Sequence, residues 1–273
     1  MKEIDAALVQ SEIEKLIARC LVCPDKAVTS ALENIDTDVP SEKRAAQLIV
    51  ENNKIAERDD VYCCQDTGQA LFFVKLGDGV HCEGLSVALQ RAVRNAYKTA
   101  RKSVADPFTR LNTGDNTPAI VETELVPGDE LEITFLAKGA GSENMSKLYM
   151  LTPASGTQGV IDAVVDAVRS GGANACPPLV VGVGVGGVTE TACMLSKRAL
   201  LRPLGQSNAR ADIADIEREI LSRVNALGIG VAALGGRLTA LAVNVETAPT
   251  HIGMLPVAVN LQCHSLRHGS ITF

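Results

Sequence analysis

The sequence contains no tryptophan, and aromatic residues of all kinds make up only 3% of its 273 positions. A chain of this length can bury a substantial hydrophobic core. Without large aromatic side chains, that core must be built from Ala, Val, Leu and Ile.

Long apolar runs and an excess of positive charge are also missing. No segment is apolar enough for a membrane span, and the first twenty residues mix acids and bases where a signal peptide has an apolar stretch. The sequence therefore predicts a cytoplasmic protein with no membrane partner. A formal net charge of −6 disfavours nucleic acid as a partner, because clustered Lys and Arg neutralise phosphates. A small anion stays compatible, since a few local cations decide its binding.

Cysteine, by contrast, is plentiful, with eight residues. In a reducing compartment, cysteines are metal ligands, reactive thiols or core residues more often than disulfide partners. Cys20 and Cys23 have the spacing of a zinc-ligand pair, but a zinc ribbon needs a second pair, which the sequence lacks. Cys20 follows Leu16 and Ile17 at helical spacing, so we assign it to the core.

Apolar periodicity divides the chain into helices and strands. The expected helices cover residues 4–17, a segment that starts at Pro40 with Ser41 as its N-cap, and residues 84–104, 158–170, 189–201 and 213–227. The expected strands cover residues 71–76, 120–125, 131–136, 179–185, 238–245 and 255–262. Pro127-Gly128-Asp129 should join the second and third strands as a hairpin. We predict a mixed α/β (α+β) fold over residues 1–273, helical first and sheet-rich afterwards, in a single compact unit.

Two polar segments occur where a hydrophobic core does not need them. Cys64-Gln65-Asp66-Thr67-Gly68 gathers a thiol, an amide, a carboxylate and a hydroxyl before a glycine. Its spacing alone favours a turn with an incidental buried cysteine. In residues 138–144, KGAGSEN, the glycines let backbone N–H groups approach a carboxylate or phosphate, and a flexible surface loop is an equal alternative.

Two further segments carry thiols and imidazoles. In Ala175-Cys176-Pro177-Pro178, the two prolines restrict the backbone to an extended conformation before the next strand. Cysteines that bind iron–sulfur clusters are often followed by proline. A core cysteine is the alternative. The last part of the chain gathers His251, Cys263, His264 and His268. Neighbouring residues of a strand point to opposite faces, and this spacing matches no closed zinc site, so zinc is disfavoured.

The glycine run in residues 182–187, GVGVGG, satisfies the G-x-G-x-x-G pattern of dinucleotide-binding folds. The strand with an acidic end that should follow about twenty residues later is absent. We therefore predict that these glycines allow close packing of a strand on a helix. A nucleotide-binding oxidoreductase is kept as a distant alternative.

Five segments in order resemble class I fumarases and the related tartrate dehydratases, over residues from about Asp60 to Arg267. They are CQDTG at 64–68, NTGDNTPA at 112–119, KGAGSEN at 138–144, ACPP at 175–178, and HIG with PVAVN and CH between 251 and 264. We call these the family-like segments. Cys63 and the link at 187–191 depart from the family's pattern, which loosens the substrate assignment more than the chemistry.

The resemblance implies a [4Fe–4S] cluster held by Cys64, Cys176 and Cys263. Three thiolates leave one of four irons open to substrate oxygen as a Lewis acid. Cys63 is a rival ligand, and Cys64 is preferred because it directly precedes Gln-Asp-Thr-Gly.

The resemblance also implies the substrate site. Gln65 and Asp66 would border the substrate, with Asp66 as the candidate acid. Arg101 would clamp one carboxylate and the backbone N–H of Gly141 would bind the other. His251 would act catalytically in a neighbouring protomer. Without the resemblance, Arg101 is read as a solvated cation and His251 as a histidine of a strand-end loop.

The implied activity is that of a fumarate hydratase alpha subunit, which interconverts fumarate and L-malate. L-tartrate dehydratase and a mesaconase-type hydratase are the alternatives of the same chemistry, and a non-catalytic domain with a structural cluster is an alternative of another class. Single-chain members continue into a domain that supplies the catalytic base, so a separate beta-type subunit is implied and this chain alone should be inactive. The expected assembly is α2β2 or a homodimeric core of alpha chains.

Overall fold

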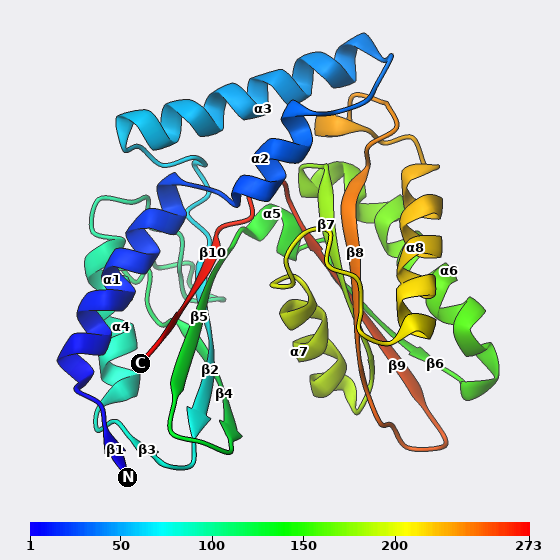
Figure 1. Cartoon of the computed structure of the whole chain (residues 1–273). Coiled ribbons are helices and arrows are strands. Elements are labelled where there is room, and N and C mark those ends of the chain that lie inside the picture. The colour runs from blue at the N-terminus through cyan, green and yellow to red at the C-terminus, as the bar shows by residue number, and fades with distance from the viewer. The chain divides into compact units, whose positions relative to one another are not determined.

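The computed structural model describes residues 1–273, which divide into two compact units. Unit 1 comprises Met1–Asp25, Asn52–Ala140 and Ser265–Phe273, and unit 2 comprises Lys26–Glu51 and Gly141–His264. The mixed α/β class is confirmed, with helices first and sheets afterwards (Figure 1). Each unit contains a four-stranded sheet with a hydrophobic core of its own. None of the helices combines the length and apolar character needed to cross a bilayer.

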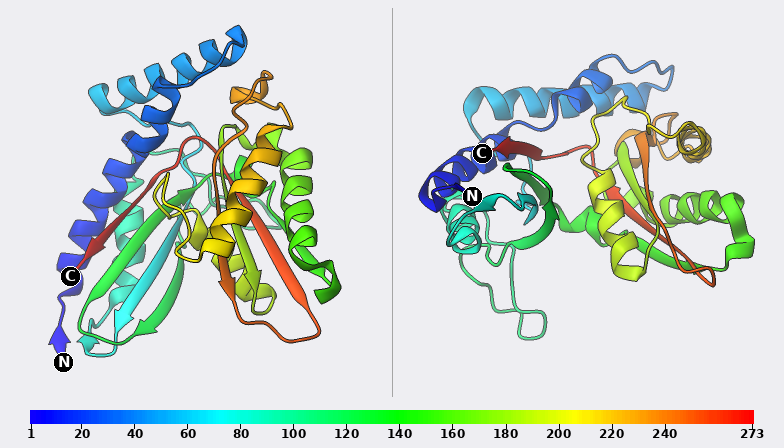
Figure 2. Two further views of the ribbon diagram at one scale, coloured as in Figure 1. Left: turned by 45° about the vertical axis from the view of Figure 1, so that its right-hand side comes forward. Right: turned by 60° about the horizontal axis from the view of Figure 1, so that its bottom comes forward.

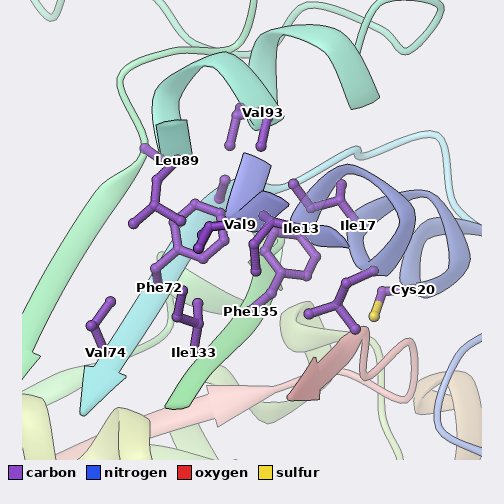
Figure 3. Close-up of a cluster of buried hydrophobic side chains, with 14 of the residues drawn as sticks. Val9, Ile13, Ile17, Cys20, Phe72, Val74, Leu89, Val93, Ile133 and Phe135 are labelled. Carbon is purple, nitrogen blue, oxygen red and sulfur yellow. The ribbon is translucent and has the colours of Figure 1, made fainter. Parts of the chain in front are cut away.

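Unit 1 is built on a four-stranded sheet with the order β10-β5-β2-β4. Its elements are β1 (Lys2–Glu3), α1 (Ala6–Val22), β2 (Gln69–Gly77), β3 (Val80–His81), α4 (Leu85–Ala96), β4 (Ile120–Val126), β5 (Leu131–Lys138) and β10 (His268–Thr272). Ile13 and Ile17 of α1 and Leu89 of α4 pack with Phe72 and Phe135 of the sheet (Figure 3). Cys20 is buried in the same cluster, as predicted.

Two expectations for unit 1 are wrong. The turn around Pro127-Gly128-Asp129 does not make a hairpin, because β2 lies between β4 and β5, parallel to the first and antiparallel to the second. β2 is largely buried along its length, which favours the centre of the sheet. The helix expected over 84–104 ends at Ala96. Beyond it, the ammonium of Lys102 donates to the carbonyls of Lys98 and Ala100 at 2.9 and 3.0 Å.

Unit 2 is built on a four-stranded sheet with the order β6-β9-β7-β8. Its elements are α2 (Lys26–Glu33), β6 (Lys147–Leu151), η1 (Pro153–Ser155), α6 (Gly156–Gly171), η2 (Gly172–Ala175), β7 (Leu179–Gly186), α7 (Thr189–Ala199), α8 (Ala211–Asn225), η3 (Val231–Ala233), β8 (Ala240–Ala248) and β9 (Leu255–Gln262). Two more helices, α3 (Pro40–Asp59) and α5 (Ala140–Glu143), span the boundaries between units. Helix α7 covers one face of the sheet, and α6 and α8 cover the other (Figure 2).

The start of α3 differs from the prediction. The helix begins at Pro40, so Ser41 lies in its first turn and is not the N-cap. Proline is well suited to that first position, where no helical N–H bond is needed. The Ser41 hydroxyl donates to the carbonyl of Leu234 at 3.4 Å.

The glycine run of β7 packs as predicted. A Cβ atom on Gly182 would lie 2.0 Å from the carbonyl oxygen of Ser196, and one on Gly184 would lie 2.0 Å from that of Ala192. Both oxygens belong to α7. The glycines therefore let the helix backbone rest directly on the strand, which confirms the packing interpretation of the G-x-G-x-x-G pattern.

Candidate functional site

In unit 1, the carboxylate of Asp66 closes the turn that leads into β2. Its Oδ1 accepts the N–H of Gly68 at 2.9 Å, and its Oδ2 accepts the N–H of Ala140 at 2.8 Å. Gly68 has a φ of 72°, the left-handed conformation that glycine tolerates best. Two family-like segments, at 64–68 and 138–144, are thus joined through one side chain. Since both oxygens are engaged, this geometry suits a group that holds two loops together.

A second charged group, the guanidinium of Arg267, lies under the same turn. Arg267 is only 1% exposed, and its Nη1 donates to the carbonyl of Asp66 at 2.7 Å. A Cβ atom on Gly139 would lie 3.1 Å from Oδ2 of Asp66 and 3.7 Å from Nη2 of Arg267. Gly139 therefore leaves room for both charged groups. The sequence alone did not suggest a role for Arg267. The one feature that could have drawn attention to it is its position at the end of the region that resembles the family.

The backbone of Arg101 is held beside this turn by a small network. The hydroxyl of Thr67 and the amide of Asn116 each donate to the Arg101 carbonyl at 3.0 Å. Thr67 also pairs with the Ser103 hydroxyl at 2.9 Å, and Asn116 accepts the Ser103 N–H at 2.6 Å. Arg101 is exposed, so its guanidinium is available to an anion. The segment at 112–119 thereby joins the other two.

The neighbouring thiols of Cys63 and Cys64 have different surroundings. Cys63 is buried, its thiol lies 3.5 Å from the Ser265 hydroxyl, and its N–H donates to Leu21 at 3.1 Å. Burial raises the pKa of the Cys63 thiol, and burial also raises the pKa of Cys20 to about 12. Cys64 is partly exposed. Of the adjacent pair, Cys64 is the accessible thiol.

In unit 2, the backbones of Cys176 and Cys263 lie close together at one end of the central strands β7 and β9. Cys176 precedes β7, Cys263 follows β9, and the two strands are antiparallel neighbours. The N–H of His264 donates to the Cys176 carbonyl at 3.3 Å, and the side-chain amide of Gln262 donates to the Cys263 sulfur at 3.4 Å. Cys176 is exposed, with a φ of 55° that turns the chain just before Pro177.

The segment at 138–144 continues in unit 2, where it is fixed to the sheet. The carboxylate of Glu143 pairs with the ammonium of Lys197 on α7 and accepts the side-chain amide of Asn260 on β9 at 3.0 Å. Gly141 is exposed, and a Cβ atom there would approach only the Asn174 carbonyl, at 3.9 Å.

His251 and Cys263 lie at opposite ends of β9. It lies in the loop before β9, whereas Cys263 follows that strand, and the eight residues of β9 span about 25 Å. Its Nδ1 accepts the N–H of Gly253 at 3.1 Å. The exposed imidazole lines a pocket of about 410 Å³ with Ile213 and Ile216 of α8.

The side chains of the chain form no site for a single metal ion. No three His, Cys, Asp or Glu side chains gather as ligands of one ion. A four-iron cubane binds each thiolate through a different iron, so its ligands lie further apart than those of one ion. Cys64 of unit 1 and Cys176 and Cys263 of unit 2 are at least partly exposed, and no disulfide occupies any of the eight cysteines.

Comparison with known proteins gives consistent matches along the chain. A family model described as "Fumarate hydratase (Fumerase)" matches residues 10–272. The "Putative L(+)-tartrate dehydratase subunit alpha" of Methanocaldococcus jannaschii is 37% identical over 267 residues, covering 93% of this chain and 94% of that protein. The "L(+)-tartrate dehydratase subunit alpha" of Escherichia coli strain UTI89 is 36% identical over 215 residues, covering 76% of this chain and 71% of that protein. The same subunit of strain K12 is 35% identical over the same length.

Proposed function

Because this chain belongs to the fumarate hydratase (Fumerase) family, we propose that it is the alpha subunit of an iron–sulfur hydro-lyase acting on a four-carbon dicarboxylate. The reaction adds water across the double bond of fumarate to give L-malate, or removes it. The observation that carries the proposal is the closeness of two backbone segments, those of Cys176 and Cys263, each next to a strand end within a family-like segment.

The residues proposed to hold a [4Fe–4S] cluster are Cys64, Cys176 and Cys263. When bound with three thiolates, the cluster supplies a Lewis acid for the oxygen that the substrate gains or loses. The burial of Cys63 supports Cys64 as the ligand of that pair.

The remaining proposed residues bind and orient the substrate. Arg101 offers a planar guanidinium for bidentate binding of one carboxylate, and Gly141 offers its N–H to the other. Gln65 is exposed next to Asp66 and can donate an amide N–H to the substrate. The two N–H bonds to Asp66 favour a positioning role, and donating a proton would require one of them to be released.

The proposed partner is a beta-type subunit, because the relatives are named as alpha subunits. It would supply the catalytic base. Alone, the chain should be inactive. In an α2β2 assembly or a homodimeric core, His251 would reach the site of a neighbouring copy, in keeping with its distance from Cys263 within its own chain.

Fumarate is the first substrate that we propose, and L(+)-tartrate is the second, favoured by the names of the relatives. The test is anaerobic purification together with the beta-type chain of the same organism, followed by measurement of kcat/KM for fumarate, L(+)-tartrate and mesaconate. Fumarate should give the highest value. A higher value for tartrate or mesaconate would reassign the substrate. Iron-free protein, inactive on all three after reconstitution, would refute the hydro-lyase proposal.

A further inference from the structure

Glu42, in the first turn of α3, is a buried carboxylate outside every family-like segment. It is 0% exposed. Its Oε1 accepts the N–H of Leu238 at 2.8 Å, and its Oε2 accepts the N–H of Arg237 at 3.0 Å and the hydroxyl of Thr37 at 2.6 Å. Such a saturated acceptor is unusual for a glutamate in a helix.

The loop at 228–238, which surrounds Glu42, has a strained backbone. Ala232 and Ala233 have φ values of 53° and 58°, and each residue with a side chain in this left-handed region costs about 1 kcal/mol. A Cβ atom on Gly236 would lie 2.2 Å from the carboxyl carbon of Glu42. The loop is therefore shaped around the carboxylate, and the hydrogen bonds to Glu42 offset its strain.

The same loop supports the segment that carries Cys176. The N–H of Ala232, next to Val231, donates to the carbonyl of Pro177 at 2.8 Å. Pro177 directly follows Cys176, which itself has a left-handed backbone. On its other side, the Cys176 carbonyl accepts the N–H of His264. The backbone of Cys176 and Pro177 is thus held between His264, just after β9, and the loop that Glu42 organises.

We propose that Glu42 is a positioning residue for Cys176, acting through the loop at 228–238 and the carbonyl of Pro177. This inference rests on the proposed role of Cys176 as a cluster ligand. Burial alone would raise the pKa of Glu42, but the bonds from the Thr37 hydroxyl and from the N–H groups of Arg237 and Leu238 lower it, so the carboxylate binds the loop as an anion. The N-terminus of α3 favours the same charge.

The experiment compares Glu42→Ala and Glu42→Gln with a matched control, Glu217→Gln. Glu217 is another buried glutamate of unit 2, only 6% exposed, and it accepts two backbone N–H groups, from Asn208 at 3.1 Å and Val245 at 2.7 Å. It makes no bond to the loop at 228–238 or to Pro177. Two readouts are used: iron and sulfide per chain after anaerobic reconstitution at limiting iron, and the rate at which iodoacetamide alkylates Cys176 in the iron-free protein.

For Glu42→Ala, we expect about tenfold weaker iron retention, the usual effect of removing a group that supports a metal ligand. Glu42→Gln should fall between this and the parent, because the amide keeps one acceptor oxygen but turns N–H groups toward a backbone donor. Alkylation of Cys176 should change in both variants while that of Cys64 stays constant. Glu217→Gln should leave both readouts unchanged even if it lowers the unfolding temperature.

If both Glu42 variants match the parent in iron retention and Cys176 alkylation, the inference is overturned. If Glu42→Ala does not fold, as judged by circular dichroism, Glu42→Gln alone decides the question. A Cys176→Ser variant separates the proposed ligand role of Cys176 from the proposed positioning role of Glu42. Full cluster content in that variant would refute the ligand assignment and with it this inference, whereas loss of the cluster alongside unaffected Glu42 variants would refute only the role of Glu42.

Discussion

The two units hold their candidate residues in different ways. In unit 1, the family-like segments are loops, and single side chains join them: Asp66 through two N–H bonds, and Thr67 and Asn116 through the carbonyl of Arg101. In unit 2, the thiols of Cys176 and Cys263 are placed by the pairing of adjacent strands. Unit 1 should therefore be sensitive to the loss of individual polar side chains, and unit 2 to changes in backbone packing.

The largest expected effect concerns the thiols. Cys64→Ser, Cys176→Ser and Cys263→Ser should each abolish cluster assembly, because a cubane with only two protein thiolates is poorly held. Iron and sulfide analysis under anaerobic conditions measures this. Cys63→Ser and Cys193→Ser are the matched controls and should retain the cluster, since Cys63 is a core thiol and Cys193 lies on α7. A dispensable Cys176 would break the assignment in unit 2, and a dispensable Cys64 would break it in unit 1.

The packing of unit 2 can be tested at Gly184. Gly184→Ala should lower the free energy of unfolding by about 3 kcal/mol, because the new Cβ would overlap the carbonyl of Ala192 and push α7 off the strand. Urea unfolding measures the change. Gly205→Ala is the control, with a φ of 83° and open space around it, and should cost only about 1 kcal/mol. Equal costs would mean that strand–helix contact does not limit unit 2.

The corresponding test in unit 1 is Arg267→Met. Its hydrogen bond to the Asp66 carbonyl is lost and a buried acceptor is left bare, which should cost about 2 kcal/mol of unfolding free energy. Arg94→Met removes a guanidinium that is 57% exposed and paired with Asp115, and should cost about 0.5 kcal/mol or less. If Arg267→Met were as mild as this control, the polar network would not be what holds unit 1.

The smallest expected effect is a dependence of stability on pH. Bonds from the hydroxyl and N–H of Thr117, and then from Arg94, lower the pKa of Asp115 to about 2 from 3.8. Stability from this ionised carboxylate is present above pH 3.8 and is lost as the pH falls through about 2. Because the group is partly exposed, the loss should be about 1 kcal/mol. Urea unfolding of Asp115→Asn between pH 5 and pH 2 should show a flatter profile than the parent.

Elements whose signal is local could be predicted well from the sequence. The apolar face of α8 and the Val- and Gly-rich run of β7 are properties of consecutive residues, and both were found within a few positions. The order of the strands in a sheet, by contrast, depends on contacts between distant parts of the chain. The hairpin between β4 and β5 was the simplest interpretation of the turn, but the burial of β2 placed that strand between them. The chain beyond α4 likewise receives bonds from Thr67 and Asn116, which lie elsewhere in the sequence.

The candidate site shows the same limit. The segments with Cys64, Cys176 and Cys263 could be found because their residue order resembles a known family. Arg267 and Glu42 could not, since a buried Arg and an exposed Arg read alike in a sequence, and Glu42 sits among charged residues at the start of a helix. Only the tertiary structure distinguishes them, through the carbonyls and N–H groups that they meet.

The chain passes between the two units four times, and β10, which completes the sheet of unit 1, is made after the whole of unit 2. During synthesis, α1 and β2 leave the ribosome early but must wait for the final strand, whereas unit 2 can close as soon as His264 has emerged. The unit that starts first is therefore finished last, and Arg267 reaches its place beneath Asp66 among the final steps of folding.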